Sequence, residues 1–206
     1  MPKKIGYLGP AGTFTEAAAI EYDSESTLVP LPSIPSVAES VRSGETDEGI
    51  VPIENSLEGA VTTTLDLLIQ EKTLFIRQEL AIPIEHCLLS SYAWTDNSIK
   101  LIYSHPQALG QCKHFLEKRF PNAQIVATLS TVAAVEQMKC SDLPAAAIAP
   151  KRASDLYDVN VLEIGIQDHP NNVTRFVVLA LNDHQPTGDD KTSLCFAFDE
   201  NRPGLL

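Results

Sequence analysis

Residues 4–22 read KIGYLGPAGTFTEAAAIEY, and this stretch decides the fold. The apolar run Lys4–Leu8 predicts a strand, and the periodic apolar positions of Thr13–Tyr22 predict a helix. The connection Gly9-Pro10-Ala11-Gly12 supplies glycines that let the backbone approach a ligand closely. It lacks the endings of phosphate-loop and dinucleotide motifs, so a small anion is the better candidate ligand. A strand, a short loop and a helix in this order indicate an α/β protein.

The same alternation continues along the chain and predicts an α/β fold with largely parallel sheets. Strands are expected near residue 28 and over 49–53, 101–103, 125–127, 146–149 and 173–181, and helices over 35–42, 65–70, 106–119 and 131–139. The extended stretch 74–90, interrupted by Pro83, predicts a crossover into a second lobe. The apolar run 173–181 predicts a strand on which the chain returns to the first lobe. We therefore expect one lobe of about 1–80 plus 166–182 and another of about 81–165.

Composition excludes several classes of function. The chain has 206 residues, 44% of them hydrophobic, and a formal net charge of −12. This acidity argues against a general nucleic-acid binder and against binding to anionic membranes. No apolar run approaches the roughly 18 residues that span a bilayer, and the N-terminal residues resemble a strand more than a signal peptide. The four cysteines form no C-x-x-C pair, so reduced thiols in the cytoplasm are expected.

Three short polar stretches lie where helices are expected to begin. Thr13-Phe14-Thr15-Glu16 and Ser104-His105-Pro106-Gln107 fit the capping-box pattern, and Asn55-Ser56-Leu57-Glu58 is a looser version. A helix N-terminus presents unpaired N–H groups and can hold an anion without a lysine. Each stretch follows a predicted strand, where open α/β sheets bind ligands. The alternative is simple capping, which contributes about 1 kcal/mol for each helix.

A further polar cluster precedes the last long strand. It includes Asp168, Asn172, Thr174 and Arg175. Arg175 within an apolar strand indicates either an ion pair with a carboxylate or a bidentate grip on a substrate carboxylate, and the residues alone favour neither. Thr174 is also compatible with a β-branched residue that only packs. The five histidines show no metal-ligand spacing, and no Ser-His-Asp order or carboxylate pair supports hydrolysis.

At these residues the chain resembles the prephenate dehydratase family. The matching stretches follow the family's order and extend from residue 4 to about 181; they are Gly9-Pro10-x-Gly12-Thr13-Phe14, Pro52-Ile53-Glu54-Asn55-Ser56-x-x-Gly59-x-Val61-x-x-Thr64-x-Asp66, Ser104-His105-Pro106-Gln107-Ala108-Leu109-x-Gln111-Cys112, and Gln167-Asp168-x-x-x-Asn172-x-Thr174-Arg175-Phe176. The resemblance implies a two-lobed, periplasmic-binding-protein-like (type II) fold with the active site in the cleft between the lobes. It also implies a cytoplasmic lyase of phenylalanine biosynthesis that converts prephenate to phenylpyruvate, water and carbon dioxide without a metal or organic cofactor.

The resemblance also assigns roles to individual residues. It implies that Thr174 is catalytic and that the substrate-binding residues are Thr13, Asn55, Ser56, Ser104, Gln107 and Arg175. After a linker at 183–190, residues 191–206 resemble the beginning of a regulatory ACT domain, with a strand expected over 192–198. In the family that domain binds phenylalanine, so Gly204 and Leu205 are expected to belong to an incomplete allosteric site. The chain is expected to be either a fragment or an enzyme without its feedback module. The sequence does not decide whether the protein forms a homodimer.

Two other functions fit parts of the pattern. A non-catalytic two-lobed protein that binds a small carboxylate would need the same architecture and the same helix-end anion sites. An arogenate dehydratase would use the same chemistry on a related substrate. A module that senses an amino acid is a third reading, although the short ACT-like segment cannot form such a site by itself.

Overall fold

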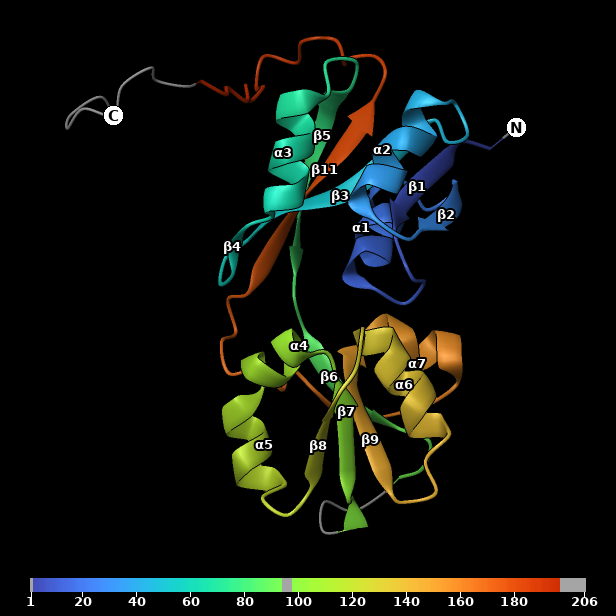
Figure 1. Cartoon of the computed structure of the whole chain (residues 1–206), viewed down its shortest axis with the longest axis vertical. Helices are drawn as coiled ribbons and strands as arrows, with labels where there is room; N and C mark the ends of the chain where they lie inside the picture. Colours follow the sequence, from blue (N-terminus) through green and yellow to red (C-terminus); the bar gives the residue numbers. More distant parts are fainter. Residues whose placement is uncertain (1, 94–97, 197–206) are drawn as a thin grey trace, which may run out of the picture.

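The computed structural model of the protein describes residues 2–93 and 98–196, which form two lobes, one above the other in Figure 1. Each lobe contains one sheet with helices on both faces. The expected two-lobed α/β fold is therefore confirmed. None of the helices in the described residues could span a membrane.

The first lobe contains a sheet that includes both the first strand of the chain, β1, and the last, β11. Its strands are β1 (Lys4–Leu8), β2 (Thr27–Leu31), β3 (Glu48–Asn55), β4 (Gly59–Ala60), β5 (Phe75–Pro83) and β11 (Val173–Ala180), and its helices are α1 (Phe14–Tyr22), α2 (Ile34–Arg42) and α3 (Thr62–Gln70). The strand order is β2-β1-β3-β11-β5, with β4 beside β3. Helix α1 packs on one face, where Phe176 and Val178 of β11 point, and α2 and α3 pack on the other with Val177 and Leu179. Because both faces are covered, β11 is apolar almost throughout.

The second lobe repeats this arrangement with its own sheet. Its strands are β6 (His86–Ser90), β7 (Leu101–Ser104), β8 (Gln124–Ala127), β9 (Ala145–Pro150) and β10 (Asn160–Ile164), and its helices are α4 (Pro106–Gln111), α5 (Lys113–Arg119), α6 (Thr131–Lys139) and α7 (Lys151–Tyr157). The order is β10-β6-β9-β7-β8. Helices α4 and α5 pack on one face, and α6 and α7 on the other. Ser130 caps α6 as expected, since its Oγ accepts the N–H of Ala133 at 3.0 Å.

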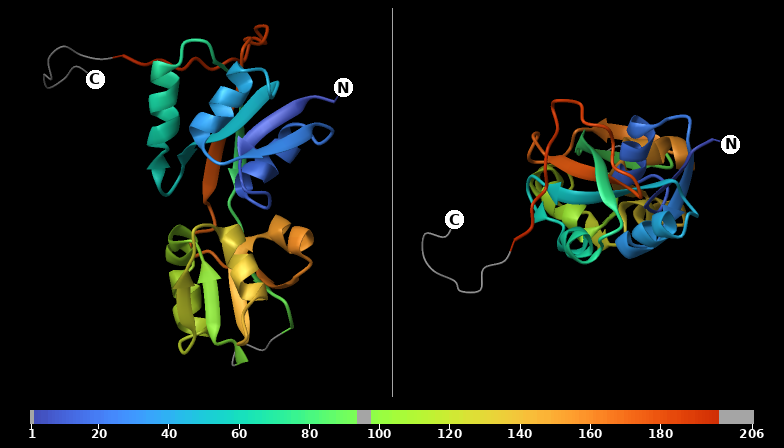
Figure 2. Two further views of the ribbon diagram at one scale, coloured as in Figure 1. Left: turned by 45° about the vertical axis from the view of Figure 1, so that its right-hand side comes forward. Right: turned by 90° about the horizontal axis from the view of Figure 1, so that it is seen from above.

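Both sheets are mixed, so the prediction of largely parallel sheets was wrong. Strand β1 is parallel to β2 and β3, but β11 is antiparallel to both of its neighbours, β3 and β5. In the second sheet β6 is antiparallel to β9 and β10. The reason is the double crossing between lobes, because the chain leaves the first lobe on β5 and returns on β11 in the opposite direction. Figures 1 and 2 show these two connections between the lobes.

The helix expected over 106–119 is two helices that meet at Cys112, whose backbone is not helical. Asp168, which precedes the return crossing, binds both helices at this break. Its carboxylate accepts the N–H groups of His114 at 3.0 Å and Phe115 at 3.3 Å, which are unpaired donors in the first turn of α5. Its own N–H donates to the carbonyl of Gln111 at 2.7 Å, so the return segment is fastened to the end of α4.

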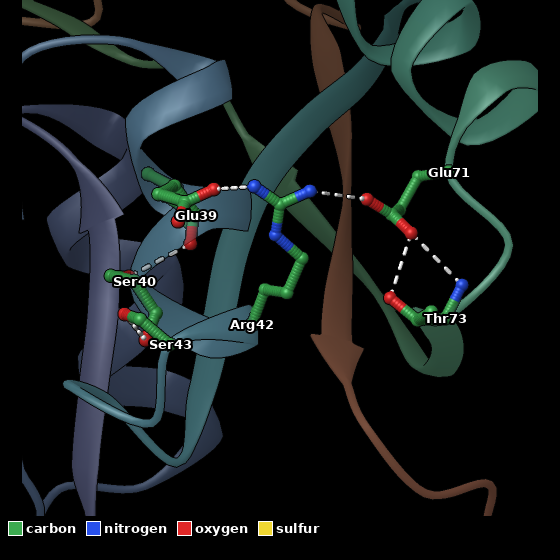
Figure 3. A network of polar contacts seen from close by, with 7 residues as sticks. Glu39, Ser40, Arg42, Ser43, Glu71 and Thr73 are labelled. Carbon is green, nitrogen blue, oxygen red and sulfur yellow. Dashed lines mark hydrogen bonds and ion pairs between the residues drawn. The ribbon is translucent and has the colours of Figure 1, made fainter.

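Polar contacts also tie the outer parts of the first lobe together. Arg42 at the end of α2 contacts Glu39 and lies 3.6 Å from Glu71 after α3, and Glu71 accepts hydrogen bonds from Thr73 (Figure 3). The expected strand over 192–198 is absent from its described part, 192–196, and the rest lies outside the described residues. Gly204 and Leu205 also lie outside them.

Candidate active site

Asn55 and Thr174 face each other where β3 ends and β11 begins. They are paired in register across the antiparallel strands, and Nδ2 of Asn55 lies 2.8 Å from Oγ1 of Thr174. Because the amide donates, the threonine hydroxyl oxygen is the acceptor. Among residues 2–93 and 98–196, no acceptor is recorded for the hydroxyl hydrogen of Thr174. Thr174 therefore keeps a donor available for a bound molecule.

Asn55 is held by a turn and not by a helix start. Its Oδ1 accepts the N–H groups of Leu57 at 2.9 Å and Glu58 at 3.0 Å, in the turn that joins β3 to β4. The expectation that this stretch begins a helix was wrong, since α3 begins only at Thr62 and lacks a side-chain cap. An asparagine side chain that binds the backbone two residues further on stabilises such a turn. The side chain of Asn55 is buried, and these two bonds hold its oxygen in place.

From Asn55 a row of hydrogen-bonded side chains runs into the second lobe. Nδ2 of Asn55 donates to Oδ1 of Asn172 at 2.8 Å, and Nδ2 of Asn172 donates to Oε1 of Gln111 at 3.0 Å. His86 Nε2 lies 2.8 Å from the same Oε1. We call these residues, Thr174, Asn55, Asn172, Gln111 and His86, the amide chain. It joins β11 and β3 of the first lobe to α4 and β6 of the second.

The amide chain was only partly visible in the sequence. Asn172 and Gln111 belong to the quoted motifs, but the sequence gives neither a role in the site, and no pattern in the sequence marks His86. His86 is 3% exposed and burial lowers the pKa of its imidazole, against a smaller opposing effect of Gln111. Its ring also packs edge-on against Phe14, with centroids 5.6 Å apart. A neutral imidazole is therefore the form that this position favours.

Thr13 lies on the same side of the first lobe, at the beginning of α1. As predicted it is the N-cap, and its Oγ1 accepts the N–H of Glu16 at 3.4 Å. Glu16 is buried, accepts the N–H of Gly12 at 2.8 Å, and lies 3.4 Å from Arg152 of α7 in the second lobe. Gly12 has φ +89°, and a Cβ there would meet Val132 of α6. The glycine loop therefore contacts the second lobe directly.

The remaining predicted site residues are placed differently from one another. Ser56 Oγ accepts the N–H of Val173 at 3.0 Å and so joins the Asn55 turn to β11. Ser104 is fully buried and its Oγ donates to the carbonyl of Ile148 at 2.7 Å, within the second sheet. Gln107 is exposed near the start of α4. The capping box predicted from Ser104 was wrong, because His105 is the N-cap and its Nδ1 accepts the N–H of Gln107 at 3.3 Å.

Arg175 is occupied by carboxylates. Its guanidinium lies 2.5 Å from Glu54 on β3 and 2.5 Å from Glu79 on β5, the two strands that flank β11. These contacts raise the pKa of Arg175, Glu79 first and Glu54 second. Of the two alternatives open from the sequence, the ion pair is the one present in this structure. The arginine braces three strands directly beside the Asn55–Thr174 pair.

Two surface hollows lie away from the amide chain. One, of about 240 Å³, is lined by Glu48 at the start of β3 and Ala180 at the end of β11, the opposite strand ends from Asn55 and Thr174. The other, of about 420 Å³, is lined by Ser91 and Ala145 at the outer end of the second lobe. In the described parts of the chain, no cluster of three His, Cys, Asp or Glu residues could hold a metal ion.

The fold and the amide chain together define a class, the two-lobed α/β proteins with a polar site where the lobes meet. Within that class, the prephenate dehydratase family model matches residues 5–184. The chain is 40% identical over 206 residues to the bifunctional chorismate mutase/prephenate dehydratase of Pseudomonas aeruginosa, covering 100% of this chain and 56% of that protein. It is 38% identical over 208 residues to the prephenate dehydratase of Lactococcus lactis, covering 98% and 74%.

A solved structure agrees with these relatives. The prephenate dehydratase of Arthrobacter aurescens in complex with L-Phe superposes with a TM-score of 0.82 at 35% identity, covering 92% of this chain and 63% of that one. The chain belongs to the prephenate dehydratase family. It spans only about half the length of the Pseudomonas relative, at 56%.

Proposed function

We propose that the chain is the catalytic unit of a prephenate dehydratase, a lyase that converts prephenate to phenylpyruvate, carbon dioxide and water. The observation that carries this proposal is the 2.8 Å hydrogen bond from Asn55 to Thr174. Because Asn55 donates in this bond, the hydroxyl hydrogen of Thr174 stays free of it, and the residues that the structure describes offer that hydrogen no other acceptor. The bond also draws electron density from the hydroxyl oxygen, which makes that hydrogen a better donor.

The reaction needs such a donor because a hydroxide must leave. The bond from the ring to its carboxylate breaks, the electron pair moves into the ring to complete the aromatic system, and the ring C–O bond breaks. The departing oxygen keeps the C–O pair and takes one proton to become water. In our proposal the Thr174 hydroxyl donates a hydrogen bond to this oxygen as its charge develops, while the proton comes from solvent. A threonine hydroxyl is a poor acid, so we assign it hydrogen bonding and orientation.

Neutral groups suit the carboxylate that leaves. A strong cation there would stabilise the carboxylate of the ground state and oppose its loss, since only interactions that strengthen in the transition state raise the rate. The carboxamides of Asn55 and Asn172 near Thr174 are neutral and therefore place no positive charge there. Arg175 is already paired with Glu54 and Glu79, which supports a structural role or a place nearer the pyruvyl carboxylate. The start of α1, capped by Thr13, remains our candidate for holding the other carboxylate.

Turnover tests the proposal directly. The purified chain is incubated with prephenate, and phenylpyruvate is followed by its absorbance at alkaline pH; steady formation is expected. Arogenate in a parallel reaction, with phenylalanine as the product measured, reports which substrate is preferred. Tight binding of prephenate without turnover would contradict the proposal and favour a two-lobed carboxylate-binding protein.

Three further proposals concern the wider protein. Phenylalanine is a feedback effector if a complete ACT domain is present, an idea supported by the L-Phe complex of the Arthrobacter relative. A homodimer is testable by light scattering during gel filtration. A cytoplasmic location is supported by four free thiols, of which burial raises the pKa of Cys87 to about 11 and of Cys112 to about 12, so these two are poorly reactive.

A further inference from the structure

The direction of every hydrogen bond in the amide chain is set by the backbone. The N–H groups of Leu57 and Glu58 can only donate, so the atom of Asn55 that they contact must be its oxygen. The other atom of that amide is then the nitrogen, which donates to Thr174 and to Asn172. Two backbone N–H groups therefore determine how the first carboxamide is oriented.

The same reasoning extends through the second lobe to a histidine. Since Asn172 accepts from Asn55 with its oxygen, its nitrogen donates to Gln111. The Gln111 atom that accepts is an oxygen, Oε1, so His86 can contact it at 2.8 Å only as a donor. The neutral tautomer of His86 with hydrogen on Nε2 is thereby selected.

The burial of His86 agrees with this tautomer. Its Nδ1 is buried and has no hydrogen-bond partner among the described residues, so a hydrogen placed on it would be an unsatisfied donor inside the protein. Burial also lowers the pKa of the imidazole, which disfavours the doubly protonated ring. The unpaired lone pair on Nδ1 is the less costly arrangement, because a buried acceptor without a partner is tolerated more often than a buried N–H.

We propose that His86 is a positioning residue for the reaction and is held as the Nε2–H tautomer. In this form His86 fixes the Gln111 carboxamide. Gln111 in turn holds Asn172, and Asn172 keeps the Asn55 donor directed at Thr174. The catalytic part of this proposal rests on the proposed dehydratase function. Oε1 of Gln111 has two lone pairs, and His86 and Asn172 occupy both. Nε2 of Gln111 reaches Glu58 at 3.3 Å, a longer contact. Without His86 the carboxamide of Gln111 would lose its shortest restraint.

Two substitutions separate the hydrogen bond from the packing of the ring. His86→Phe keeps a ring of similar size against Phe14 but removes the donor. His86→Gln retains an amide donor close to the position of Nε2. We expect His86→Phe to lower kcat by about 10- to 100-fold with a much smaller change in KM, as misplacement of a catalytic group does. His86→Gln should recover most of kcat.

Ser90→Ala is the matched control. It lies on the same strand β6, and it removes a buried 2.6 Å hydrogen bond to the carbonyl of Ala145 without touching the amide chain. It should lower stability while leaving kcat unchanged. Urea unfolding of each variant shows whether it is folded under assay conditions. If His86→Phe retains wild-type kcat, or if His86→Gln is no better than His86→Phe, the positioning role is wrong.

A second measurement remains informative even if the protein does not turn over prephenate. Long-range ¹H–¹⁵N correlation of the histidine rings in the wild-type chain should show His86 with hydrogen on Nε2 and none on Nδ1, and the His86→Phe spectrum identifies the signal. Hydrogen on Nδ1 would overturn the proposed tautomer and the chain of donors that leads to it. The expected tautomer without any turnover would contradict the proposed function and leave the hydrogen-bond order intact.

Discussion

Asn55 and Thr174 are cross-strand partners, and their 2.8 Å side-chain hydrogen bond is a consequence of strand register. A shift of one residue between β3 and β11 would turn one of the two side chains to the other face of the sheet. The register is secured on both sides of β11, by β3 and by β5, and by the ion pairs of Arg175 with both strands. The contacts that hold the register of the first sheet therefore also hold Asn55 and Thr174 in place.

The role of Thr174 predicts a clear difference between two variants. Thr174→Ser keeps the hydroxyl and should keep most of kcat. Thr174→Ala removes the donor to the leaving hydroxyl and should lower kcat by about 10²-fold or more, the usual effect of losing one preorganised donor. Steady-state kinetics with prephenate measures both. An alanine variant with wild-type kcat would refute the assignment.

Replacing the amide nitrogen of Asn55 by oxygen tests the direction of its hydrogen bond to Thr174. Asn55→Asp has nearly the same shape, but it replaces the donor by an acceptor that faces two acceptors, Oδ1 of Asn172 and Oγ1 of Thr174. The Thr174 hydrogen should then turn toward the new carboxylate and away from the substrate. We expect kcat to fall about as far as in Thr174→Ala, roughly 10²-fold.

The added negative charge of Asn55→Asp also repels an anionic substrate, and this second effect should appear mainly in KM. Adding the substitution to Thr174→Ala provides the control. If Asn55 acts through Thr174, the double variant should have nearly the kcat of Thr174→Ala alone. A full multiplication of the two kcat losses would show that Asn55 acts independently.

Most strand and helix segments could be predicted from the sequence because apolar periodicity and capping residues are local signals. Thr13 and Ser130 cap α1 and α6 as their sequence neighbours indicate. Strands β4 and β10 were not predicted; β4 has two residues, and β10 is a short edge strand of five residues. The orientation of β11 and β6 could not be predicted either, because it depends on how the chain crosses between lobes.

The amide chain shows a different limit of the sequence. Its bonds join residues 119, 117, 61 and 25 positions apart, and amide side chains leave no periodic signal. Motif matching included Asn172 and Gln111 but could not say what they contact. The Asn55 stretch was wrongly assigned to a helix start because an asparagine that caps a helix and one that stabilises a turn both accept nearby N–H groups. Which backbone follows is decided by the pairing of β4 with β3.

A double substitution distinguishes two roles for Arg175, a structural ion pair and binding of a substrate carboxylate. Arg175→Met leaves Glu54 and Glu79 without their shared partner and should lower stability by about 1 kcal/mol or less for each exposed pair. Adding Glu79→Gln should restore part of this loss. If Arg175 instead binds a substrate carboxylate, KM should rise strongly in Arg175→Met, and Glu79→Gln should not lower it.

The pH dependence gives the Arg175 test a further check. Arg175 first, and Lys191 second, hold the pKa of Glu79 below its usual value of 4.5. A carboxyl with a depressed folded-state pKa contributes stability above its unfolded-state pKa, and the contribution is lost as the pH falls through the folded-state pKa. The stability difference between wild type and Glu79→Gln should therefore be constant near neutral pH and shrink below about pH 4.5. Urea unfolding at several pH values measures it.

Gly12 and Gly44 form a matched pair for the contact between the lobes. Both have positive φ, +89° and +76°, so alanine is strained at either position. A Cβ on Gly12 would lie 3.3 Å from Val132 and 3.5 Å from Leu156 of the second lobe, whereas a Cβ on Gly44 would have no atom of another described residue within 4 Å, apart from its chain neighbours. Gly44→Ala should cost about 1 kcal/mol, and Gly12→Ala should cost more and also raise KM. Equal stability losses with unchanged KM would show that the Gly12 contact does not matter.

Because His86 is buried as the neutral base, we expect the protein to lose stability as the pH falls below neutral. Because burial lowers its pKa below 6.5 in the folded protein, the unfolded chain binds a proton there first as the pH falls. Stability linked to His86 is thus fully present above about pH 6.5 and is lost progressively between that value and its folded-state pKa. Urea unfolding of wild type and His86→Phe from pH 8 to pH 5 isolates this residue, since the other histidines are common to both. The wild type should lose stability more steeply over this window, whereas a constant difference between the two curves would mean that His86 is not buried as the neutral base.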